Sequence, residues 1–355
     1  MRSDAQQGEF LPFENLRAVS LSNRGLTNFG SGLTISMARQ LTFACGAYDR
    51  TRPLIDGRVK PEGLELNWIV LSPHEIWTRM LNHYEFDASE MSLASYIISR
   101  TLNKPLIAIP VFPARSFRHS FVYVNKKSGI IKPKDLEGKR VAQAEFQQTA
   151  AVMVRGFLQN EYGVDLETIR WFNWYQPRTE VKLHKSYKVE SLPSAGAAEK
   201  MLENGEIDAM ICASHPQFAL NGSPSVKRLV SNPKEEEIAY YTKTKIFPIM
   251  HTVVIREELW RADPWIATSL TKAFQQAKEI AYDTLNSKLP FNISLAWLGE
   301  PLREQKEILG DDPWAYGFSK NKHNVETLMQ YLLEQGLISK ALKAEEVFAP
   351  NSLAT

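Results

Sequence analysis

Residues 41–54 read LTFACGAYDRTRPL and contain the unit from which the chain is built. Leu41–Ala44 has the length and apolar character of a short buried strand. The Arg52-Pro53 step is typical of a helix start, because a proline at the first helical position gives up no needed hydrogen bond. The stretch therefore predicts a strand, then a polar loop at 48–52, then a helix.

The same alternation continues outward from this stretch. Further strands are expected at 64–71, 88–91, 106–111 and 121–125. Ser72-Pro73-His74-Glu75 and Ser92 have the residue types of helix caps. Strands that alternate with helices are typical of an α/β layer, so we expect a mostly parallel sheet.

A polar, turn-rich segment at 126–135 indicates that the chain crosses there into a second α/β unit. That unit is expected to contain strands at 140–144, 170–174 and 207–213 and helices at 149–162 and 195–204, with a long polar excursion at 175–190. An apolar stretch at 246–255 predicts a return strand, followed by helices at 266–285 and 325–335. We therefore expect an N-terminal extension at 1–40, a discontinuous lobe I at 41–124 plus 247–355, and lobe II at 125–246.

The composition of the chain indicates the number of domains and excludes some classes of partner. The 355 residues favour two domains, and 42 Lys and Arg against 40 Asp and Glu leave a net charge of +2. No basic block of the kind that binds a phosphate backbone is present, so we expect no nucleic acid partner. Cys45 and Cys212 are too far apart in sequence for a CxxC motif or a disulfide framework.

The distribution of charged and apolar residues along the sequence predicts the cellular compartment of the protein. The first 40 residues carry scattered acidic and basic side chains, which is unlike a signal peptide, and no apolar run is long enough for a membrane span. We therefore expect a cytoplasmic protein without membrane contact. An organelle transit peptide and a homo-oligomer are alternatives that stay open.

Five segments closely resemble the 4,5-dihydroxyphthalate decarboxylase family. They are LTFACGAYDRTRPL at 41–54, FDASEMSLASY at 86–96, IPVFPARSFRHS at 109–120, DLEGKRV at 135–141 and QTAAV at 148–152. The resemblance extends over about residues 41–350 and implies a two-lobed type II periplasmic-binding-protein-like fold with a ligand cleft between the lobes. It also implies release of carbon dioxide from a hydroxylated aromatic carboxylic acid. The excursion at 175–190 and the first 40 residues depart from the family pattern.

Candidate site residues follow the ends of predicted strands, where ligands bind in open α/β sheets. Tyr48, Asp49, Arg50 and Arg52 form one such loop, and a carboxylate is expected there, although an Arg-Asp ion pair that only fastens the loop is the alternative. Further polar side chains stand at three other strand or helix ends. These are Glu90 with Ser92, Gln148 with Thr149, and the histidines His215 and His251. For each of them the alternative is a purely structural role, as a helix cap or as a packed residue.

The leading catalytic loop is Arg115-Ser116-Phe117-Arg118-His119. Its two guanidiniums can hold carboxylates, and its imidazole can move a proton near neutral pH. We expect His119 to protonate the ring, with Glu90, Asp49 and His251 as further catalytic candidates. Tyr48, Arg50, Arg52, Ser92, Arg115, Arg118, Gln148 and Thr149 are the expected substrate-binding residues.

No cofactor motif is legible in the sequence. His74-Glu75 is followed by the next histidine only at His83, which does not fit the HExxH pattern of zinc enzymes. There is no GxGxxG, GxxxxGK[ST] or GxSxG segment. We therefore expect chemistry without a metal or other cofactor.

Two alternative functions share the implied fold. A non-catalytic solute-binding protein for a small aromatic or anionic ligand is disfavoured by the lack of a visible signal peptide. A thiamine pyrimidine-precursor synthase would be expected to carry a cysteine-rich iron motif, and Cys45 and Cys212 stand alone.

Overall fold

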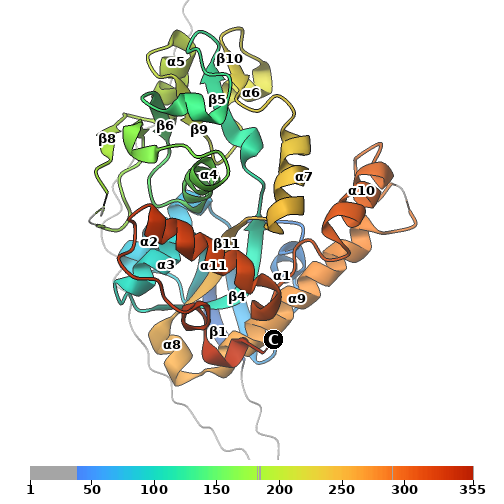
Figure 1. Ribbon diagram of the computed structural model, residues 1–355. Helices are drawn as coiled ribbons and strands as arrows, with labels where there is room; N and C mark the ends of the chain where they lie inside the picture. The colour runs from blue at the N-terminus through green and yellow to red at the C-terminus, as the bar shows by residue number, and fades with distance from the viewer. Residues whose placement is uncertain (1–37, 182, 184, 290, 355) are drawn as a thin grey trace, which may run out of the picture. The chain divides into compact units, whose positions relative to one another are not determined.

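The computed structural model describes residues 38–354 except 182, 184 and 290, and the expected N-terminal extension lies outside the described residues up to residue 37. Two β-sheets organise the described chain, and in Figure 1 sheet B lies above sheet A. Sheet A has the strand order β2-β1-β3-β11-β4 and consists of β1 (Arg39–Ala44), β2 (Leu64–Ile69), β3 (Ala88–Ser92), β4 (Leu106–Arg115) and β11 (Ile249–Arg256). Sheet B has the order β10-β5-β9-β6-β7-β8 and consists of β5 (Val122–Asn125), β6 (Arg140–Gln143), β7 (Arg170–Asn173), β8 (Lys188–Ser191), β9 (Ala209–Ile211) and β10 (Val226–Arg228).

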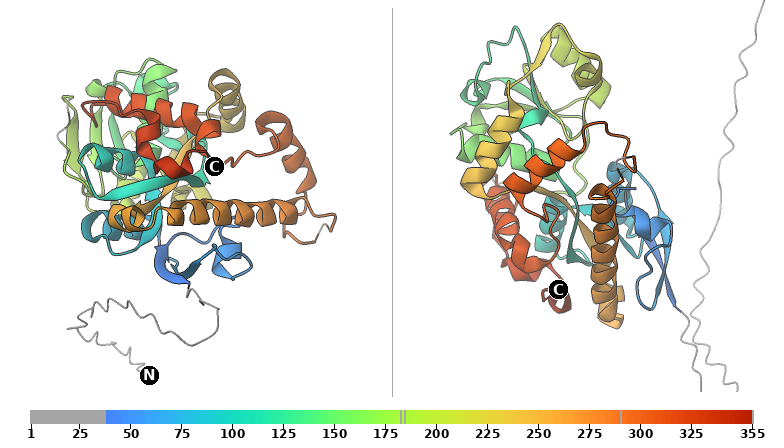
Figure 2. Two further views of the ribbon diagram at one scale, coloured as in Figure 1. Left: turned by 90° about the horizontal axis from the view of Figure 1, so that it is seen from below. Right: turned by 90° about the vertical axis from the view of Figure 1, so that its right-hand side faces the viewer.

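Helices cover both sheets, and α9 and α11 lie on opposite sides of sheet A (Figure 2). In chain order the helices before β9 are α1 (Arg52–Ile55), α2 (Pro73–His83), α3 (Leu93–Thr101), α4 (Thr149–Asn160) and α5 (Ala195–Asn204). Those after β9 are α6 (Gln217–Asn221), α7 (Pro233–Thr244), α8 (Glu257–Ala262), α9 (Trp265–Leu285), α10 (Gly299–Leu309) and α11 (Phe318–Glu334).

The chain crosses between the sheets twice. It leaves sheet A after β4, enters sheet B at β5, and returns through α7 into β11. The return strand β11 lies between β3 and β4 and is antiparallel to both, while β5 is antiparallel to β9 and β10. In the described part of the chain, four of the five strands of sheet A and five of the six strands of sheet B therefore run in the same direction, which confirms the prediction of mostly parallel sheets. The exceptions are β11 and β5, each of which arrives from the other sheet and runs against its new neighbours. The predicted boundaries of lobe I and lobe II stay a prediction.

Gly156 determines how closely helices α4 and α11 approach each other. Gly156 of α4 lies against the ring of Tyr331 of α11, and a Cβ atom at position 156 would collide with that ring. The two helices therefore approach more closely than larger residues allow. This contact joins α4, which follows a strand of sheet B, to a helix that packs on the sheet A side.

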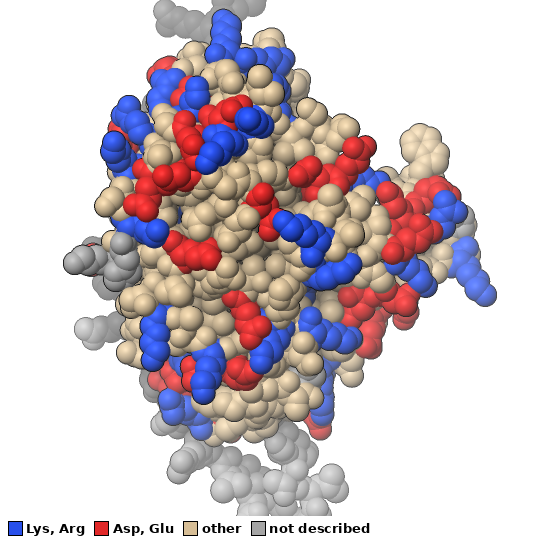
Figure 3. All heavy atoms as spheres, in the orientation of Figure 1, with Lys and Arg blue, Asp and Glu red and all other residues tan. Residues whose placement is uncertain are grey.

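Side chains of both charges share the face of the molecule that Figure 3 shows. Acidic and basic side chains are interspersed on the face shown in Figure 3, in agreement with the net charge of +2. No described helix has the length and apolar character needed to cross a membrane.

Candidate active site

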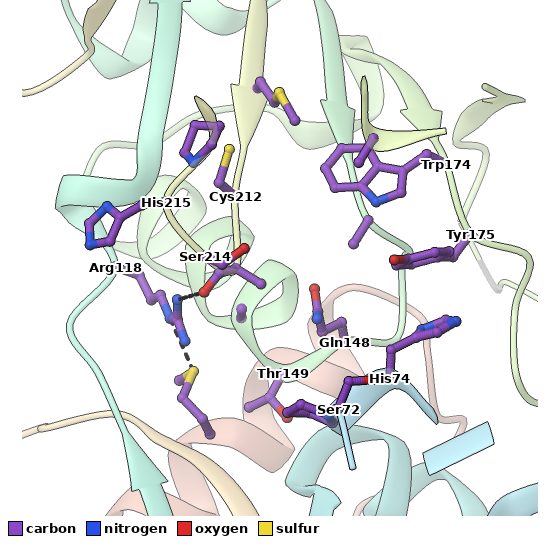
Figure 4. Close-up of a pocket in the computed structure, with 18 of the residues that line it drawn as sticks. Ser72, His74, Arg118, Gln148, Thr149, Trp174, Tyr175, Cys212, Ser214 and His215 are labelled. Atoms are coloured by element: carbon purple, nitrogen blue, oxygen red, sulfur yellow. Dashed lines mark hydrogen bonds between the residues drawn. The ribbon is translucent and has the colours of Figure 1, made fainter. Parts of the chain in front are cut away.

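A cavity of about 390 Å³ lies between elements of sheet A and elements of sheet B (Figure 4). Its volume is within the range of about 300–1,000 Å³ that is common for small-molecule sites. The polar and aromatic side chains that line it are Ser72, His74, Trp77, Arg118, Gln148, Thr149, Trp174, Tyr175, Glu199, Cys212, Ser214, His215 and His251. The rings of Trp77, Trp174 and Tyr175 among these polar groups suit a flat, polar aromatic ligand.

His251 in the cavity wall is paired with a buried carboxylate. It lies on β11 and its Nδ1 is hydrogen-bonded to Oε1 of Glu90 on the neighbouring strand β3. Glu90 is fully buried, and its carboxylate also accepts hydrogen bonds from the Tyr48 hydroxyl at 2.6 Å and the Gly46 backbone N–H at 2.9 Å. With Nδ1 bound to Glu90, Nε2 is the ring nitrogen of His251 that remains for a ligand.

The carboxyl group of Glu90 is ionised in spite of its burial. Burial alone would raise its pKa, but the charge of His251 and the hydrogen bonds from His251, Tyr48 and Gly46 together lower the pKa to about 2. The buried carboxylate of Glu90 thus holds the imidazole of His251 in place at the cavity wall through Nδ1.

Gly46 allows Tyr48 to reach Glu90. A Cβ atom at position 46 would lie 2.7 Å from Cζ of the Tyr48 ring, which is closer than carbon atoms pack. The loop is fastened by Thr51, whose hydroxyl donates to the Gly46 carbonyl at 2.9 Å and accepts the Tyr48 N–H at 2.8 Å. The loop after β1 thus supports Glu90 from behind the cavity.

Arg118 is the guanidinium in the cavity wall. It lies in the crossing between β4 and β5, donates from Nη1 to the Ala213 carbonyl at 2.8 Å and from Nε to the Met250 sulfur at 3.1 Å. Burial lowers its pKa to about 10, so it is still a cation at neutral pH. Two of its five N–H donors are engaged by these contacts, and the others are available for an anion.

Helix α4 begins at the cavity with Gln148 and Thr149. The Thr149 hydroxyl is 2.8 Å from the Ser92 hydroxyl and accepts the Ala94 N–H at 3.0 Å. Gln148 and Thr149 line the cavity, whereas Ser92 lies behind Thr149 and is not among the lining residues. Ser92 therefore positions the start of α4 beside the cavity.

The predicted loop residues Asp49, Arg50 and Arg52 do not line the cavity. Arg50 forms an ion pair with Asp49 at 2.8 Å and donates to the Pro113 carbonyl at 2.6 Å. Arg52 is exposed at the start of α1. Arg50 and Asp49 therefore form the ion pair that only fastens the loop, which is the alternative expected for this segment from its sequence.

Arg115 and His119 also lie outside the cavity. The Arg115 guanidinium donates to the backbone carbonyls of Phe247 and Ala315, each at 2.9 Å. The His119 ring stacks on Phe157 at 4.1 Å between ring centroids, and neither ring nitrogen has a hydrogen-bond partner among the described residues. Burial lowers the pKa of His119 to about 4, so the ring is neutral at pH 7.

Several lining residues were not predicted as site residues. Ser72 and His74 were interpreted as a helix start, and Tyr175 as the first residue of a polar excursion. Their shared signal is that each stands at or next to the end of a predicted element, which is a weak pattern in sequence alone. No three His, Cys, Asp or Glu side chains of the described part of the chain come together as a metal-binding group.

Comparison with known proteins gives two curated relatives and a set of solved structures with the same fold. The 4,5-dihydroxyphthalate decarboxylase of Comamonas testosteroni is 38% identical over 321 residues, covering 88% of this chain and 97% of that protein. The enzyme of the same name from Pseudomonas putida is 35% identical over 208 residues, covering 57% of this chain and 81% of that protein. A comparison with protein-family models gives no match.

Among solved structures, the alkanesulfonate-binding protein SsuA from Xanthomonas axonopodis pv. citri bound to MOPS has a TM-score of 0.54 at 13% identity, covering 88% of this chain and 97% of that one. This likeness confirms the predicted two-lobed periplasmic-binding-protein-like fold. The relatives confirm the resemblance found in the sequence, since one of them is matched over nearly its whole length. The chain belongs to the 4,5-dihydroxyphthalate decarboxylase family.

Proposed function

We propose that the chain removes one carboxylate of 4,5-dihydroxyphthalate as carbon dioxide, with His251 as the proton donor to the ring carbon. The observation that supports this most is the His251–Glu90 pair, which places an imidazole held by a buried carboxylate in the wall of a cavity that also contains aromatic side chains. The names of the relatives supply the substrate class.

The proposed reaction consumes one proton and releases one neutral molecule. A new C–H bond forms between the proton of His251 and the ring carbon that bears the departing carboxylate, helped by electron density from the para hydroxyl. The bond between that carbon and the carboxylate then breaks, its electron pair restores the aromatic ring, and carbon dioxide leaves. General acid catalysis of this kind typically contributes about 10²- to 10⁴-fold to the rate.

Arg118 and the start of α4 are proposed to hold the second carboxylate, which stays on the ring. A cation that gripped the departing carboxylate would stabilise the bound substrate more than the transition state, since that carboxylate loses its charge as the reaction proceeds. Arg118 is therefore expected to contribute to binding and orientation.

The assignment of the proton donor to His119 stays an alternative within this proposal. His119 lies outside the cavity with a neutral ring packed on Phe157, which supports His251 in its place. The free, buried thiols of Cys45 and Cys212 fit the reducing, cytoplasmic compartment expected from the sequence.

The test compares His251→Asn with His119→Phe. Carbon dioxide release from 4,5-dihydroxyphthalate is measured in single turnover, and binding is measured with phthalate, which lacks the activating hydroxyls. We expect His251→Asn to lower the rate by about 100-fold or more while phthalate affinity changes little, and His119→Phe to keep most of the rate.

The opposite pattern would move the proton donor to His119. Binding without release of carbon dioxide by the unaltered protein would favour a solute-binding role on this fold.

A further inference from the structure

The excursion after β7 contacts helix α2 at one side of the cavity. The rings of Tyr175 and His74 stack at 3.8 Å between centroids with an angle of 20° between their planes. Figure 4 shows the two rings one above the other at the edge of the pocket. Both residues line the cavity, so this contact between an element of sheet B and an element of sheet A is part of its wall.

Arg178, three residues further along the excursion, fixes the chemistry of the His74 ring. Its Nη2 lies 2.6 Å from Nδ1 of His74. A guanidinium has only donors, so Nδ1 must be the acceptor, and the ring proton must be on Nε2. No hydrogen bond joins Nε2 to another residue of the described chain.

Arg178 is itself held in place. Its Nη1 forms an ion pair with Glu145, and both side chains are almost fully buried. Its guanidinium also lies over the ring of Trp77, 5.0 Å from the centroid, one turn along α2 from His74. A second hydrogen bond holds the excursion in place, because the side chain of Gln147 donates to the Thr179 carbonyl at 2.5 Å. An arginine with these contacts has little freedom to leave His74.

We propose that His74 is a substrate-binding residue that donates its Nε2–H to an anionic oxygen of the substrate, and that Arg178 is the positioning residue that fixes this tautomer. The proposal rests on the proposed function, since it assumes that the substrate occupies this cavity. It adds a neutral donor from the opposite wall to the cation supplied by Arg118.

A neutral donor suits a carboxylate or phenolate whose charge changes during the reaction. It orients the oxygen, and it stabilises the charged ground state less than a second guanidinium would. A protonated His74 would place two like charges in contact with each other. Burial and the Arg178 charge both lower the pKa of His74, which agrees with a neutral ring.

The tautomer is tested first, without any substrate. In long-range ¹H–¹⁵N spectra of the histidine rings, the His74 signals are identified by their loss in His74→Phe. We expect an unprotonated Nδ1 and a protonated Nε2 in the unaltered protein. Arg178→Gln is expected to give a mixture of tautomers or a titrating ring. A His74 protonated at Nδ1, or spectra unchanged in Arg178→Gln, would overturn the positioning role.

Binding is tested with phthalate as the probe and compared with turnover of 4,5-dihydroxyphthalate. His74→Phe keeps a ring for stacking on Tyr175 but removes the donor, and we expect about 10- to 100-fold weaker phthalate binding and a similar rise in KM. His74→Gln can accept from Arg178 and still donate, so it should recover part of the loss. His83→Phe is the matched control, because His83 is exposed on the same helix.

The controls separate the two proposals. Unchanged phthalate affinity in His74→Phe, with turnover still lost in His251→Asn, would overturn the role of His74 and leave the proposed function standing. Normal turnover in His251→Asn together with weakened binding in His74→Phe would overturn the proton donor alone. Failure of the unaltered protein both to bind phthalate and to release carbon dioxide from 4,5-dihydroxyphthalate would overturn both.

Discussion

At the scale of single residues, the site depends on pairings that no local pattern predicts. Glu90 and His251 were both candidates, because each stands on or next to a predicted strand. Their contact exists because β11 returns from the other sheet and inserts beside β3. The sequence pattern of His74 indicates only a helix start and an incomplete zinc motif, since its partners Tyr175 and Arg178 lie about a hundred residues away in sequence.

His119 shows the opposite case, in which a residue with suitable chemistry is used for packing. Its folded-state pKa of about 4 lies below the ordinary value of 6.5 because the ring is buried. Between these two values the unfolded chain binds a proton that the folded chain does not. The contribution of the neutral ring to stability is therefore complete above pH 6.5 and is lost as the pH falls toward 4.

We predict that His119→Phe reduces the acid sensitivity of folding. A phenylalanine can keep the stack on Phe157 and does not titrate. The loss of unfolding free energy between pH 7 and pH 4.5 should become smaller by about 2–3 kcal/mol than in the unaltered protein. Urea titrations at the two pH values measure this, with the exposed His83→Phe as control. An unchanged pH dependence would show that His119 has an ordinary pKa.

At the scale of elements, the periodic spacing of apolar residues predicted those helices that bury one face. The predicted helices at 195–204 and 266–285 are confirmed by α5 and α9. Helices α6 and α7 were not predicted, and α10 was covered only by the expectation that the chain from Pro264 onward is mostly helical. In α7 only Tyr240 is fully buried and α10 buries none of its residues, so neither carries a strong periodic signal. Helices of this kind depend on tertiary contacts and capping.

The change in stability caused by Gly156→Ala distinguishes close packing of α4 on α11 from helix propensity, because the two effects have opposite signs. In an open helix, Gly→Ala stabilises by about 0.5–1 kcal/mol. At position 156 the added methyl group meets the Tyr331 ring, so we expect Gly156→Ala to destabilise the fold by about 1–3 kcal/mol. Gly196→Ala in α5 is the control, because the nearest atom to its added carbon is 4.0 Å away. Equal effects of the two substitutions in urea unfolding would show that α4 and α11 are not closely packed.

At the scale of the molecule, the alternation of strands and helices was enough to predict two α/β units and a double crossing between them. The reversed direction of β5 and β11 was not predictable from it, because the direction of a strand depends on where it inserts when it arrives from the other sheet. The position of the cavity follows from both crossings. Arg118 from the first crossing and His251 from the second line the same space.

The last prediction concerns the linkage between ligand binding and folding of both sheets. Arg118 donates hydrogen bonds to the carbonyl of Ala213, which follows a strand of sheet B, and to the sulfur of Met250 on β11 of sheet A. An anion held by Arg118 is therefore linked to both sheets through this side chain. A ligand at 100 times its Kd stabilises the folded state by about 2.7 kcal/mol. Losing a charged hydrogen bond of about 1.5–3 kcal/mol weakens binding by about 10- to 100-fold. At the same phthalate concentration, a 100-fold weaker Arg118→Ala variant would gain only about 0.4 kcal/mol.

The measurement is the shift in unfolding midpoint that phthalate produces in each variant, relative to the same variant without ligand. This comparison removes any change in stability that Arg118→Ala causes by itself. Arg52→Ala is the matched control, since Arg52 was also predicted to bind substrate but is exposed at the start of α1. We expect the full shift in Arg52→Ala and most of it to vanish in Arg118→Ala. A full shift in Arg118→Ala would mean that the anion is held elsewhere, and the loop at 48–52 would then be the next candidate.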